Sequence, residues 1–171
     1  MCEVIANVVC VGNMLMQDDG AGPAAARALE AAVAAGVRIN DAGLAVSDVI
    51  STLDPTVPLV VIDAVRGSGP PGSVYRLRLD HTLQPDGVSG AMLSLHEVSV
   101  LPALRMEALS GRPFHDVTVF GIEPEIVEWG IGLSEPVAAG LEHLVKSVLS
   151  HLEMLGAACA PSADGTGELS L

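Results

Sequence analysis

Two strongly apolar runs constrain the fold of this chain more than any other feature of its sequence. Residues 3–11 are rich in Val and Ile and end at a Gly-Asn pair, and residues 59–62 read Leu-Val-Val-Ile before Asp63. Runs of β-branched residues without polar alternation are typical of strands that are buried on both faces. Such strands require helices on both sides of the sheet, as in α/β proteins with parallel strands.

The rest of the sequence alternates between strand and helix patterns. Further strands are expected at residues 37–40, 74–79 and 117–122. The strand at 74–79 is placed nearer an edge, because its apolar and charged residues alternate. Helices are expected at residues 24–35, 45–53, 97–109 and 135–154, and a loop at residues 80–92. This order predicts a three-layer α/β/α sandwich with a mostly parallel, twisted sheet of about five strands.

The chain has the length of one domain. Its 171 residues suffice for one real core and are too few for two domains of ordinary size. Half of the residues are hydrophobic but only 2% are aromatic, so the core must consist mainly of aliphatic side chains. We predict one α/β domain over residues 1–155. Residues 156–171 are small and polar and are expected to be a disordered tail.

Charge and cysteine content narrow the classes of partner. The formal net charge of −13, from 21 acidic and 8 basic residues, repels the phosphates of nucleic acids and anionic lipids. We therefore expect neither nucleic-acid binding nor membrane insertion. The cysteines at positions 2, 10 and 159 form no CxxC pair, which indicates neither a disulfide framework nor a cysteine zinc site. This pattern fits a reducing, cytoplasmic environment.

Polar residues with metal-binding side chains follow the expected strands. Asp18 and Asp19 come after the first strand in GNMLMQDDGAGP, Asp63 ends the third strand, and His96 lies in SLHE before an expected helix. Ligands of open α/β sheets bind at the carboxyl ends of the strands. Carboxylates and an imidazole suit Ni, Zn or another divalent metal with positions open for water or substrate.

Each of these residues also has a purely structural explanation, which is favoured when the residue is taken singly. Asp18 or Asp19 could accept hydrogen bonds from free backbone N–H groups where the next helix begins. Asp63 could bond to turn amides, and His96 could be a surface or capping residue. Other site types find no support. The glycines at positions 12, 20 and 22, which follow the first strand, do not have the GxGxxG spacing of a dinucleotide site, and the GxxxxGK[ST] and GxSxG motifs are absent from the sequence.

Four motifs taken together are more specific. GNMLMQDDGAGP, VVIDAV, SLHE and GIEP occur in this order over roughly residues 4–152. In this the chain resembles the endopeptidases that mature nickel-iron hydrogenases by trimming the C terminus of the large subunit. The resemblance implies that Asp19, Asp63 and His96 are both the catalytic and the metal-binding residues, and it leaves Asp18 as a turn or cap residue. The turn at residues 41–43 departs from the double glycine common in that family.

The resemblance further implies nickel as the metal, supplied by the large-subunit precursor, and no organic cofactor. It leaves open whether a carboxylate or a metal-bound water drives hydrolysis. Two other functions remain open on the sequence alone. One is a non-catalytic assembly chaperone that binds nickel or the precursor, and the other is a small-molecule hydrolase or phosphorylase on a similar sheet.

Overall fold

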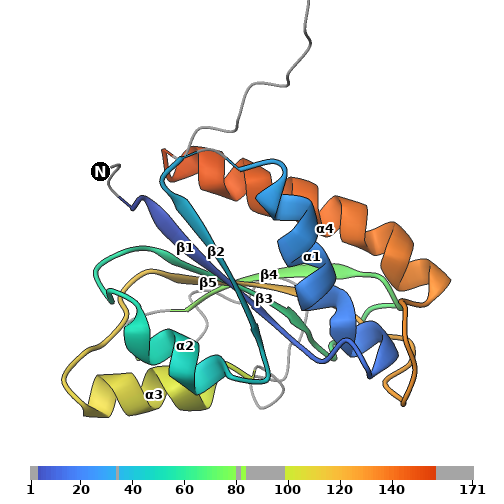
Figure 1. The fold of residues 1–171 in the computed structure, drawn as a ribbon, viewed down its shortest axis with the longest axis horizontal. Helices are drawn as coiled ribbons and strands as arrows, with labels where there is room; N and C mark the ends of the chain where they lie inside the picture. Colours follow the sequence, from blue (N-terminus) through green and yellow to red (C-terminus); the bar gives the residue numbers. More distant parts are fainter. Residues whose placement is uncertain (1–3, 34, 80–81, 84–98, 157–171) are drawn as a thin grey trace, which may run out of the picture.

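A five-stranded sheet forms the centre of the molecule (Figure 1). The computed structural model describes residues 4–33, 35–79, 82–83 and 99–156. Its strands are β1 (Ala6–Val11), β2 (Val37–Gly43), β3 (Leu59–Ala64), β4 (Val74–Leu79) and β5 (Val117–Ile122), in the spatial order β2-β1-β3-β5-β4. Only β4 is antiparallel to its neighbour, and it lies at an edge. The predicted α/β class with a mostly parallel sheet is confirmed.

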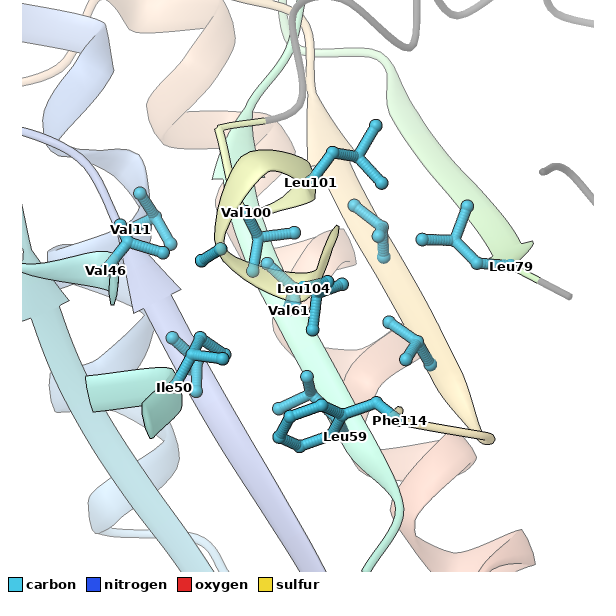
Figure 2. Packing of buried hydrophobic residues seen from close by; sticks show 14 of the residues in the cluster. Val11, Val46, Ile50, Leu59, Val61, Leu79, Val100, Leu101, Leu104 and Phe114 are labelled. Atoms are coloured by element: carbon cyan, nitrogen blue, oxygen red, sulfur yellow. The ribbon is translucent and has the colours of Figure 1, made fainter. Parts of the chain in front are cut away.

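Helices cover both faces of the sheet. On one face lie α1 (Ala21–Glu30) and α4 (Glu135–Met154), and on the other lie α2 (Val46–Thr52) and α3 (Leu101–Leu109) (Figure 1). Successive residues of a strand point to opposite faces, so Val8 packs in the α1/α4 layer and Val9 in the α2/α3 layer. Figure 2 shows the α2/α3 layer, where Ile50 and Leu104 pack with Val61. This two-sided burial explains why both runs are strongly apolar.

Several element boundaries differ from the prediction. The helix expected at 24–35 is α1, which begins earlier, at Ala21, where Gly22 packs its backbone on β1, and ends earlier, at Glu30, where the chain turns back onto the Leu29 carbonyl. A Cβ on Gly22 would lie 2.0 Å from the Val11 carbonyl oxygen. Strand β2 continues to Gly43 because its pairing with β1 extends that far, and β3 includes Asp63. The expected helix at 97–109 begins at Leu101. The expected loop at 80–92 and the expected tail lie almost entirely outside the described residues.

The strand order places three loops at one edge of the sheet. Strands β1, β3 and β5 are parallel neighbours, so the segments after Val11, Ala64 and Ile122 leave from the same edge. The first segment includes a short 3₁₀ turn, η1 (Gln17–Gly20). Gly12, with φ +136°, lies beneath this turn, and a Cβ there would overlap the Asp19 carbonyl oxygen at 1.8 Å. The glycine therefore lets η1 fold back onto the end of β1.

Within the described part of the chain, no helix is long and apolar enough to cross a membrane.

Candidate active site

Asp19 and Asp63 line one open cleft at the carboxyl edge of the sheet. The cleft has a volume of about 300 Å³. Its walls are formed by the carboxyl ends of β1 and β3, by the segments that follow β1, β2, β3 and β5, and by Ser99, which lies shortly before α3. The lining residues are Val11, Gly12, Asp19, Leu44, Asp63, Ala64, Arg66, Ser99, Pro124 and Val127. The topology thus brings together two of the acidic residues singled out in the sequence.

Asp19 lies in η1 and is half-buried. Its Oδ2 accepts a hydrogen bond of 2.8 Å from the backbone N–H of Asn13, which ties the carboxylate to the loop that follows β1. This bond holds the side chain near the end of β1, whereas helix α1 begins with Gly20 as its N-cap and has no side-chain cap. Asp19 is therefore placed at the cleft and does not cap the following helix.

Asp63 lies near the end of β3 and is only 3% exposed. Its Oδ2 accepts hydrogen bonds from the Ser99 hydroxyl at 2.5 Å and from the Ser99 N–H at 3.2 Å. Burial raises the pKa of Asp63 from 3.8 to about 6; the Ser99 bonds oppose this shift and the charge of Asp19 adds to it. A carboxyl group that titrates near neutral pH suits proton transfer in catalysis.

Asp18 has a different role from the turn or cap residue predicted. It is fully buried, and its carboxylate accepts four hydrogen bonds from residues beyond β5: from the N–H groups of Glu125, Ile126 and Ser134, and from the Ser134 hydroxyl. Burial alone would raise the pKa of Asp18, but these bonds outweigh it and hold the pKa below its usual value. Asp18 thus fastens η1 to the segment between β5 and α4.

The third predicted site residue, His96, lies outside the described residues. The structure therefore places two of the three predicted ligands. In residues 4–33, 35–79, 82–83 and 99–156, no three His, Cys, Asp or Glu side chains are grouped so that they could hold a metal ion. Two carboxylates supply hard oxygen donors but fewer ligands than the three protein side chains usual at catalytic zinc.

Comparison with known proteins decides the family. The model of a family described as HycI, hydrogenase maturation protease, matches residues 23–151. The chain belongs to the hydrogenase maturation protease family. It is accordingly a peptide-bond hydrolase, which confirms the family and the endopeptidase activity that the sequence motifs predicted.

Related proteins match over most of their length. The hydrogenase 2 maturation protease of Escherichia coli K12 is 31% identical over 90% of this chain and 94% of its own length. The hydrogenase expression/formation protein HoxM of Azotobacter vinelandii is 29% identical over 94% of this chain and 78% of its own. The solved structure of the endopeptidase HybD of E. coli superposes with a TM-score of 0.77 at 27% identity, covering 94% of this chain and 99% of that one.

The structure shows residues in the protease's cleft, and one that supports a neighbouring loop, that sequence reasoning missed. Ser99 binds Asp63, and Arg66 brings a cation to the cleft. Glu123, in the GIEP motif, is buried and accepts hydrogen bonds from the Gly67 N–H at 2.6 Å and the Tyr75 hydroxyl at 2.5 Å. Glu123 therefore anchors the loop after β3. The one sequence signal for Glu123 is its position in the GIEP motif.

Proposed function

We propose that this protease removes a short C-terminal peptide from the nickel-loaded precursor of a nickel-iron hydrogenase large subunit. The observation that carries the proposal is the pairing of Asp19 with Asp63 in one open cleft of a maturation protease. The related proteases are named for hydrogenase maturation, which supports a hydrogenase precursor as the partner. The cysteine pattern favours the cytoplasm as the place of the reaction.

Nickel enters this reaction as part of the substrate. Carboxylate oxygens and an imidazole are ligands that a divalent metal accepts. Asp19 and Asp63 would face the metal-loaded segment of the precursor from the cleft, with His96 as the third ligand proposed from the sequence. An incomplete set of ligands on the protease favours precursors that carry the metal over those that lack it.

Asp63 is the best-placed group for proton transfer. With a pKa of about 6, it is ionised at neutral pH yet basic enough to accept a proton from a water molecule that attacks the scissile carbonyl. The same carboxyl can then return that proton to the amine of the departing peptide. Ser99 orients the carboxylate through its two hydrogen bonds. This assignment makes the enzyme an aspartic-type peptidase.

The experiment is an intact-mass measurement on candidate large-subunit precursors, with and without nickel. Wild-type protein is expected to shorten only the nickel-loaded precursor, by one C-terminal peptide. Asp63→Asn is expected to slow cleavage at least about 100-fold, the usual contribution of a positioned acid-base group. Asp116→Asn is the matched control, because Asp116 precedes β5 at the opposite edge of the sheet. An unchanged precursor mass with verified nickel occupancy would contradict the proposal.

The same experiment separates the protease from a non-catalytic assembly chaperone. A chaperone would form a stable complex with the precursor without any change of mass, whereas the protease releases a shortened product. Membership of a protease family favours the second outcome.

A further inference from the structure

Large apolar side chains are concentrated on the surface around the cleft. Nine large hydrophobic side chains are exposed in the described part of the chain, and six of them lie in the segments that follow β1, β2 and β5. These six are Met14, Leu15, Leu44, Ile126, Trp129 and Ile131. Trp129, the single tryptophan of the chain, is 80% exposed, and Ile131 is 85% exposed. Large exposed aromatic and aliphatic groups in one area mark an interaction surface.

Five of these side chains, which we call the apolar rim, belong to two segments that are joined: Met14, Leu15, Ile126, Trp129 and Ile131. The Gly130 N–H donates to the Leu15 carbonyl at 2.9 Å, and the Gln17 N–H donates to the Gly130 carbonyl at 3.1 Å. In Figure 1 the two segments lie side by side beyond the ends of β1 and β5. Backbone pairing gives the rim a defined shape.

Hydrogen bonds to Asp18 also fix the conformation of the rim. Its four hydrogen bonds hold the backbone at both ends of the segment that carries Trp129 and Ile131, at Glu125 and Ile126 and at Ser134. A buried carboxylate is thus used to keep a surface with exposed apolar side chains in one conformation. Preorganisation of this kind reduces the entropy lost when a partner binds.

One of the two rim segments also forms part of the wall of the cleft. Pro124 and Val127, from the segment that carries Trp129, line the cleft with Asp19 and Asp63, and Leu44 lines its other side. A polypeptide held with its scissile bond at the two carboxylates therefore lies next to the rim. The segment with Trp129 also carries the exposed acidic residues Glu125 and Glu128, which favour basic groups on the partner beside it, whereas Arg27 contacts Met14 on the other rim segment at 3.1 Å.

We propose that the apolar rim docks the hydrogenase precursor protein through an apolar surface with basic flanks next to its scissile segment. This inference rests on the proposed function, because it takes the occupant of the cleft to be that precursor. Docking at the rim supplies affinity for the folded substrate, while Asp19 and Asp63 act on the bond. Trp129 is the anchor, since buried tryptophans dominate the binding energy of many interfaces.

The test compares Trp129→Gln and Ile131→Gln with Leu109→Gln. Leu109 is the matched control, because it is 85% exposed like Ile131 but lies on α3. Cleavage kinetics on nickel-loaded precursor should show KM raised at least about tenfold for the rim variants, with kcat within a few-fold of wild type, and no change for Leu109→Gln. Unfolding midpoints should match wild type, since the substituted side chains face solvent.

Binding is measured separately with the rim substitutions placed in Asp63→Asn protein, in which cleavage is expected to be too slow to shorten the precursor during the measurement. A Kd at least about tenfold weaker supports docking at the rim. If wild type cleaves the precursor but the rim variants show unchanged KM and Kd, the docking surface is overturned and the proposed function stands. Absence of cleavage by wild type, with weakened precursor binding by rim variants, would instead refute only the proposed function. If wild type is a dimer, the rim variants are monomers, and the Kd for the precursor is unchanged, then a second copy of the chain occupies the rim and the proposal is overturned.

Discussion

Asp18 and Asp63 are both buried carboxylates at the same edge of the sheet, yet their environments have opposite effects. Asp18 receives four hydrogen bonds, which outweigh its burial and lower its pKa. Asp63 receives the two bonds from Ser99, and burial raises its pKa to about 6. At Asp18 the hydrogen bonds outweigh burial and favour the charged form, whereas at Asp63 burial outweighs the hydrogen bonds and leaves a carboxyl that can exchange protons.

The comparison also separates neighbours in the sequence. Asp18 and Asp19 are adjacent, but Asp18 points to the segment beyond β5 while Asp19 shares the cleft with Asp63. One region fixes the loops in place and the other carries the chemistry. Substitutions in the two regions should therefore change stability in opposite directions.

Asp18→Ala is expected to have the largest effect. It leaves three backbone N–H groups and the Ser134 hydroxyl without their buried acceptor. Stability should fall by about 3–5 kcal/mol, as when one partner of a buried charged network is removed. Urea denaturation at pH 7 measures the loss, with Asp116→Asn as the control. A loss below about 1 kcal/mol would mean that Asp18 does not hold the loop.

Asp63→Asn should act in the opposite direction and stabilise the protein at pH 8. A carboxyl pKa raised from 3.8 to about 6 corresponds to about 3 kcal/mol against the charged form, which sets the upper limit of the gain. Because the folded pKa is raised, the contribution of the protonated Asp63 is complete below pH 3.8 and is lost as the pH rises through 6. The two proteins should therefore be about equally stable at low pH and diverge between pH 4 and 7 in urea denaturation. A constant difference across that range would contradict the assignment.

Ser99→Ala should shift the titration of Asp63 without removing the carboxyl. The Ser99 hydroxyl stabilises the charged form, so its loss raises the pKa of Asp63 further. The acidic limb of the pH dependence of kcat/KM should move to higher pH, while the rate on the alkaline side changes less. Ser47→Ala, an exposed serine at the start of α2, is the control. An acidic limb at the wild-type position would exclude Asp63 as the titrating group.

Asp19→Asn should have the smallest effect, a slight change in the pKa of Asp63. The charge of Asp19 contributes less to the raised pKa of Asp63 than burial does, so removing it should lower that pKa only slightly. Carbon NMR of the Asp63 carboxyl can follow the titration directly in wild type and variant. A rise of the pKa would show that Asp19 does not act on Asp63 through its charge.

Much of the fold could be predicted because its patterns are local. The strands at 74–79 and 117–122 and the helix at 135–154 were predicted with their observed boundaries. The alternation of apolar and charged residues in β4 and the helical spacing of apolar residues in α4 can each be recognised from the segment alone. The start of α1 was missed, because it depends on the contact between Gly22 and the Val11 carbonyl, which belongs to the packing of two elements.

The candidate site was less accessible to sequence reasoning. The parallel strands predicted that Asp19 and Asp63 would share an edge, and the structure places both in one cleft. The role of Asp18 could not be predicted from the sequence, because its hydrogen-bond donors lie 107 to 116 residues further along the chain. No motif marks Ser99 as the partner of Asp63. The roles of Asp19, Asp63 and His96 in metal binding and catalysis stay predictions.

The most direct test of the division between the two regions is the intact mass of a nickel-loaded precursor after incubation with Asp63→Asn protein. The variant should be folded, more stable than wild type at pH 8 and able to bind the precursor. It should nevertheless leave the precursor at full length, while wild type releases one C-terminal peptide. Cleavage by Asp63→Asn at the wild-type rate would contradict the assignment of the chemistry to this cleft.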